Sequence, residues 1–96
     1  MSRVLIERRL MDVAHRLKRA REELSVIEEQ LEVLNDAADE ARIRSLVSET
    51  PLAHREYTEA HRHADAMERT RRSVAAEIAE LQVTQDDLLD RLVSGD

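Results

Sequence analysis

The stretch "SLVSETPLAHREY", residues 45–57, decides the fold, because it contains the only proline of the chain, Pro51. The preceding Thr50 carries a hydroxyl that can accept a hydrogen bond from a free N–H group at a helix start. Proline suits the first helical position, where its missing N–H is not needed, and it disfavours the α conformation in the residue before it. We therefore predict that a first helix ends near residue 48, that a link covers residues 48–50, and that a second helix begins at Pro51.

On both sides of this stretch, seam residues recur at alternating steps of three and four, the period of a helix that packs along another helix. The first stripe consists of Ile6, Leu10, Val13, Leu17, Ala20, Leu24, Ile27, Leu31, Leu34, Ala38 and Ala41. The second consists of Tyr57, Ala60, Ala64, Met67, Arg71, Val74, Ile78, Leu81, Gln85, Leu88 and Leu92. Because a short link makes neighbouring helices antiparallel, we predict an all-α fold. It is an antiparallel two-helix coiled-coil hairpin over residues 1–96, with helices at about 3–48 and 51–93.

Composition and charge agree with this fold. Charged residues make up 38% of the 96 residues, Tyr57 is the only aromatic residue, and there is no cysteine. That is the composition of long helices, and it excludes a disulfide or zinc–thiolate framework. Residues 1–21 carry seven basic and two acidic side chains, whereas residues 73–96 carry one basic and six acidic side chains. An antiparallel hairpin lays these two blocks side by side.

Two members of the second stripe, Arg71 and Gln85, are polar. The hairpin register places Arg71 beside Ile27, and we expect its guanidinium to reach either Glu28 or Glu68. Such a contact would reduce the repulsion between these two carboxylates.

The segment "HREYTEAHRHAD", residues 54–65, is the only one that resembles a chemical site. Glu59 and His63 lie four residues apart, as do His61 and Asp65, and such pairs can bind a divalent metal. However, His61 and His63 point to different faces of a helix and no third ligand converges on either pair, so we expect a solvated polar face. The sequence contains no Gly-rich phosphate loop, nucleophile elbow or HExxH motif. We expect neither an enzyme nor a cofactor.

Two groups of branched apolar residues that lie outside the two stripes stand out: Val26 and Val33 on the first helix, and Ile43, Leu46, Val47 and Leu52 around the link. The last four flank the link, where they either close the tip of the hairpin, the interpretation we favour, or bind a partner. Val26 and Val33 are either isolated surface residues or the edge of a second helix-packing seam. All six are candidate partner-binding residues, for a protein partner or for a second copy that completes a four-helix bundle. Residues 22–40 carry eight acidic side chains and no basic one, which favours a basic partner over self-association.

Three known kinds of small helical hairpin carry characteristic motifs in the turn or along a helix. The turn "VSETPL" lacks the Trp-x-Gly of secreted WXG-type hairpins, and a single Glu49 stands where transcript-cleavage factors carry paired tip acids. The anti-sigma hairpins that bind cyclic di-GMP use E-x3-S-x2-R-x3-Q-x3-D. Ser25 and Asp36 match this pattern, whereas Arg21, Glu28 and Glu32 occupy its other three positions. A likeness in shape to such a regulator is therefore an analogy and does not assign a family.

We expect a non-catalytic protein–protein interaction module, a small cytoplasmic regulator or adaptor that acts through a helical face. The sequence shows no signal peptide and no apolar run long enough for a membrane span. The basic run "RLKRAR", residues 16–21, has an acidic counterpart inside the chain, so we do not expect a nucleic-acid partner. The alternatives are a ligand- or metal-binding helical sensor that uses residues 54–65, and an anti-sigma-like transcription regulator by analogy of shape.

Overall fold

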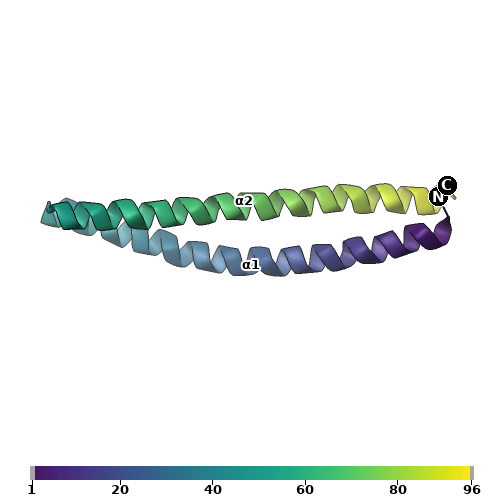
Figure 1. The fold of residues 1–96 in the computed structure, drawn as a ribbon, viewed down its shortest axis with the longest axis horizontal. Helices are drawn as coiled ribbons and strands as arrows, with labels where there is room; N and C mark the ends of the chain where they lie inside the picture. Colours follow the sequence, from purple (N-terminus) through teal and green to yellow (C-terminus); the bar gives the residue numbers. More distant parts are fainter. Residues whose placement is uncertain (1, 96) are drawn as a thin grey trace. The chain divides into compact units, whose positions relative to one another are not determined.

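The computed structural model describes residues 2–95 and contains two α-helices in this range, α1 (Arg3–Ser48) and α2 (Pro51–Ser94). The described chain has no strand, and the helices contact each other (Figure 1). The prediction of an all-α helical hairpin is confirmed. The helices begin and end within one residue of the predicted bounds, and the link consists of Glu49 and Thr50 alone.

Pro51 is the first residue of α2, as the sequence predicts. The Oγ1 atom of Thr50 accepts a hydrogen bond from the backbone N–H of Ala53 at 3.1 Å, the geometry of a helix N-cap. The predicted roles of Thr50 and Pro51 are therefore confirmed.

The end of α1 has a feature that the sequence analysis did not indicate. Glu49 adopts a φ of 53°, the left-handed region that usually favours glycine, and its N–H donates to the carbonyl of Ser45 at 3.1 Å. This residue reverses the chain between the two helices. Gly95 also has a positive φ, of 79°, directly after the last residue of α2.

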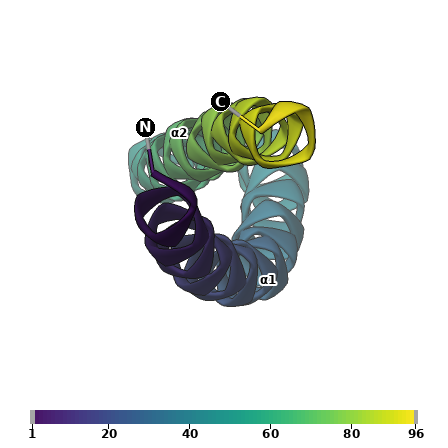
Figure 2. The same cartoon turned by 90° about the vertical axis from the view of Figure 1, so that its right-hand side faces the viewer.

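The contacts divide the chain into two compact units. Unit 1 comprises Met1–Leu24 and Ser73–Asp96, and unit 2 comprises Ser25–Arg72. In unit 1 the start of α1 and the end of α2 lie beside each other, as the purple and yellow segments show from two directions (Figures 1 and 2). Their core is a cluster of large aliphatic side chains, Ile6, Val13, Leu17, Leu81 and Leu88, with Leu10, Ile78 and Leu92 packed against it.

Unit 2 has a thinner core that consists mainly of alanine. Its buried apolar residues are Ile27, Ala38, Ala41, Ala53 and Ala64, while larger side chains such as Leu31 and Met67 are half-buried. Small side chains bury little apolar area, and the free energy gained on burial scales with that area. Unit 2 therefore gains less from its core than unit 1 does.

The predicted seam is confirmed along both helices, because every residue of the two stripes is buried or half-buried. Ser45, half-buried, and Ala53, buried, extend the alternation by one further step towards the link. The interpretation that four apolar residues close the tip is wrong. Their side chains are 59–79% exposed, and the small Ala53 is the buried residue there; the four are Ile43, Leu46, Val47 and Leu52.

Candidate interaction surface

A second stripe of residues at alternating steps of three and four runs along α1 in unit 2, and all of its members are exposed. We call it the outer stripe; it consists of Val26, Glu29, Val33, Asp36, Glu40, Ile43 and Val47. Since the seam residues of the same helix are buried or half-buried, the outer stripe is the face of α1 that α2 does not cover. Four of its seven members are branched apolar residues and three are acidic, and apolar residues that recur at this period on an uncovered face favour packing against a further helix.

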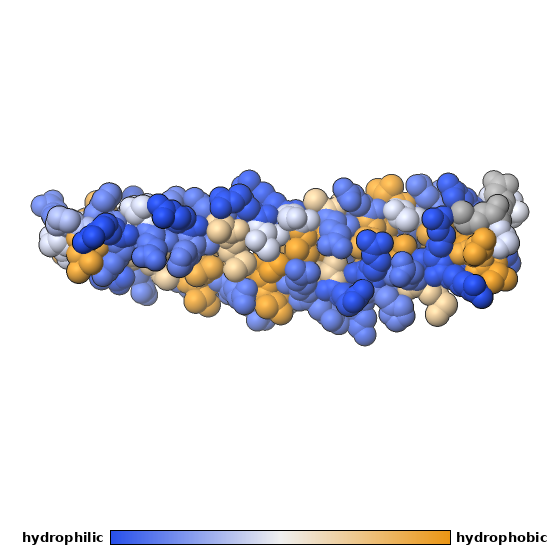
Figure 3. Space-filling model, in the orientation of Figure 1, coloured by the Kyte–Doolittle hydropathy of each residue, from blue (hydrophilic) through white to orange (hydrophobic). Residues whose placement is uncertain are grey.

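The apolar members of the outer stripe are well exposed. The exposed fraction is 52% for Val26, 68% for Val33 and 79% for Val47. Single exposed apolar residues are normal on a protein surface, but the helical period places these valines along one face of α1, where they can contact the same partner helix. Figure 3 shows that apolar side chains reach the surface of the molecule between hydrophilic ones.

The outer stripe borders a shallow depression. Glu29 and Val33 of the stripe, together with Gln30 and the seam residue Leu34, line an open hollow of about 440 Å³ on α1 within unit 2. A depression beside an exposed valine can receive an apolar side chain from another helix.

The charged members of the outer stripe are all acidic. Among the described residues, neither Glu29 nor Asp36 nor Glu40 takes part in an ion pair, because the recorded pairs use other carboxylates. The outer stripe therefore combines apolar side chains with uncompensated negative charge, which attracts basic groups.

Of the two carboxylates that the sequence placed within reach of Arg71, Glu28 and Glu68, the guanidinium pairs with Glu68. Its Nε and Nη2 atoms donate to the two carboxylate oxygens of Glu68 at 2.8 and 2.7 Å, and Arg72 donates to the same carboxylate at 3.2 Å. These hydrogen bonds, that from Arg71 above all, lower the pKa of Glu68 from 4.5 to about 2. The same bond, with a smaller contribution from the charge of Glu28, raises the pKa of Arg71. The pairing with Glu68 therefore neutralises the charge of Arg71, which occupies a polar position of the seam.

The histidine-rich segment does not assemble a metal site in the described part of the chain. His61 and Asp65 form an exposed pair at 3.4 Å, and the ring of Tyr57 lies 5.9 Å from that of His61 at an angle of 42°. No group of three or more His, Cys, Asp or Glu side chains within residues 2–95 is arranged to hold a metal ion. Glu59 and His63 thus have no third ligand among these residues.

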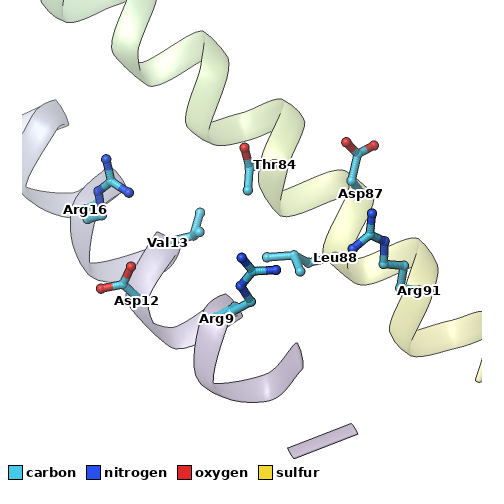
Figure 4. A pocket seen from close by; sticks show the side chains of 8 residues that line it. All are labelled: Arg9, Asp12, Val13, Arg16, Thr84, Asp87, Leu88 and Arg91. Atoms are coloured by element: carbon cyan, nitrogen blue, oxygen red, sulfur yellow. The ribbon is translucent and has the colours of Figure 1, made fainter. Parts of the chain in front are cut away.

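Unit 1 contains an open hollow of about 310 Å³ between its two helix segments. Figure 4 shows Val13 and Leu88 pointing toward each other with the Arg9 guanidinium group beside them, and the Arg91 guanidinium group on the far side of Leu88, whereas the Asp12 carboxyl group points away. The hollow therefore has an apolar floor and a rim of mixed charge.

Sequence reasoning found the apolar residues of this surface but missed its acidic members. Val26, Val33, Ile43 and Val47 lie on the outer stripe, while Leu46 is adjacent to it on α1 and Leu52 is exposed in the first turn of α2. Glu29, Asp36 and Glu40 were not singled out as site residues. The signal that could have found them is the same alternation of three and four residues, applied to the face opposite the seam.

Comparison of the chain with protein-family models finds no match, and searches of curated proteins and of solved structures find no significant similarity either. Neither helix, over the residues that the structure describes, is both long and apolar enough to cross a membrane.

Proposed function

We propose that this protein is a non-catalytic interaction module, a small cytoplasmic regulator or adaptor that binds a protein partner through the outer stripe of α1. The observation that supports it is the exposure of periodic branched apolar side chains on α1 in unit 2. Burying such side chains against a partner helix removes apolar area from water, which is favourable by about 25 cal/mol per Å².

The uneven distribution of exposed apolar residues also supports the proposal. Of the twelve large apolar side chains that are exposed within residues 2–95, eight lie on α1 and four on α2. Because α1 buries one apolar stripe against α2 and exposes another, it has two faces suited to helix packing.

Affinity capture from the native host, followed by mass spectrometry, tests this function. Three forms of the chain are compared: the unmodified protein, Val26→Glu/Val33→Glu, and the control Val83→Glu/Val93→Glu, which changes exposed valines of α2. We expect a set of proteins that the unmodified chain and the control retain and that the Val26→Glu/Val33→Glu variant loses. The captured set is inspected for the chain itself, supplied in a second, differently tagged form. Identical sets for all three forms would refute an interaction through the outer stripe.

A further inference from the structure

We propose that the occupant of the outer stripe is α1 of a second copy of this chain, whose residues 3–21 lie antiparallel along residues 25–47. This inference rests on the proposed function and names its partner. It reverses the preference for a foreign basic partner that the acidic block 22–40 suggested. The reason is the second face of α1 in unit 1, which the sequence analysis did not consider.

In unit 1, α1 also has an exposed stripe outside its seam, in the same helical phase as the outer stripe. It consists of Leu5, Arg8, Asp12, His15 and Arg19, with Val4, Met11 and Lys18 exposed beside it. The exposed fractions of Val4, Leu5 and Met11 are 57%, 50% and 64%. This face combines apolar side chains with mostly basic ones; we call it the basic stripe.

The basic stripe and the outer stripe are complementary in charge. The first presents Arg8, Lys18 and Arg19 together with one carboxylate, Asp12, and the second presents Glu29, Asp36 and Glu40, all exposed. Within the described residues, none of these side chains belongs to an ion pair, so their charges are not already compensated by such a pair. Complementary charges across an interface favour encounter and fix its direction.

The antiparallel direction follows from the order of the two stripes along α1. A parallel pair of α1 helices in register would place basic residues against basic ones and acidic residues against acidic ones. In an antiparallel pair, residues 3–21 of each copy meet residues 25–47 of the other, because both segments belong to the single helix Arg3–Ser48. Leu5, at one end of α1, then lies towards Ile43 and Val47 of the other copy, so apolar side chains meet at the two ends of the pair.

Charge reversal tests this pairing. One variant carries Arg8→Glu, Lys18→Glu and Arg19→Glu, and the other carries Glu29→Lys, Asp36→Lys and Glu40→Lys. Sedimentation equilibrium of the purified chains measures association, while circular dichroism checks that each variant retains its helices. We expect the unmodified chain to dimerise in 0.1 M salt and to dissociate more in 1 M salt, where charges are screened. Each variant alone should associate at least about tenfold more weakly, because like charges then face each other at several positions.

Mixing the two variants provides the decisive measurement. In the mixed pair, the reversed stripe of one chain meets the reversed stripe of the other, and the two unmodified stripes also meet. We therefore expect an equimolar mixture to form a heterodimer with an affinity close to that of the unmodified chain. A single chain with all six reversals should likewise dimerise with itself.

Two results would overturn the inference: an unmodified chain that stays monomeric at about 100 μM, or a mixture that associates no better than its separate components. A monomeric chain whose outer stripe still captures a foreign protein would leave the proposed function standing and refute only the second copy as partner. Loss of all capture through the stripe would refute the proposed function itself.

Discussion

Replacing Glu49 by glycine should stabilise the protein, although most substitutions destabilise. Glu49 is held at a φ of 53° between α1 and α2. For a residue with a Cβ atom, this left-handed conformation costs roughly 1–2 kcal/mol of conformational energy. Glycine avoids this cost, but its greater freedom in the unfolded chain costs about 0.5–1 kcal/mol. The difference predicts a gain of about 0.5–1 kcal/mol in the free energy of unfolding for Glu49→Gly.

Glu59→Gly is the matched control, because Glu59 is also exposed, lies off the outer stripe, and the substitution removes the same charge. Glu59 lies inside α2, where glycine costs about 1 kcal/mol. Urea denaturation followed by circular dichroism, at equal protein concentration, should therefore separate the two variants by about 1.5–2 kcal/mol. Equal destabilisation by both substitutions would show that Glu49 is not held in the left-handed region and would refute the reasoning about the turn.

Three further predictions concern the cap, the seam and the ion pair. Thr50→Ala should lower the free energy of unfolding by about 1 kcal/mol in thermal melts, whereas Thr58→Ala, inside α2, should leave it unchanged or raise it; equal losses would argue against the cap. In dilute protein, Leu24→Asp should destabilise by at least about 2 kcal/mol, because it places a charge in the seam, while exposed Val26→Asp should cost less than about 0.5 kcal/mol; the opposite order in melts would mean that the seam face is misassigned. Because the pKa of Glu68 in the folded protein is about 2 and its ordinary value is 4.5, its stabilising effect is complete above pH 4.5 and is lost as the pH falls towards 2. NMR titration of its carboxyl group should show the low midpoint, and Glu68→Gln should remove this part of the acid destabilisation; a midpoint near 4.5 would contradict the pairing.

The sequence alone predicts the seam and the start of α2, because both depend on local chemistry. Alternating steps of three and four residues identify the buried face of each helix. Thr50 and Pro51 together mark a helix start. By contrast, the conformation of Glu49 has no sequence signal, because the residue that usually marks a left-handed helix end is glycine or asparagine.

The candidate surface was only partly predictable. The sequence identifies the apolar residues near the link but does not show whether they are buried. The link has only two residues and the small Ala53 is the buried residue there, so Ile43 and Val47 remain exposed. Arg71 could reach either Glu28 or Glu68 by sequence reasoning, and it pairs with Glu68, three residues away on the same helix. A partner at this spacing is held in reach by the helix itself, whereas a pairing across two helices also depends on their separation.

The placement of the large aliphatic side chains has a consequence for how the chain folds. Unit 2 is one continuous segment, whereas the two segments of unit 1 are separated in sequence by the 48 residues from Ser25 to Arg72. Closing a loop of that length in an unfolded chain costs an entropy of about 3 kcal/mol. If the helices already contact each other near the link, the outer segments are held close together. Most of the loop-closure entropy has then been lost already, and the remaining contacts form with little further entropy loss. We therefore expect the alanine contacts of unit 2 to form before the aliphatic cluster of unit 1, which then stabilises the closed hairpin.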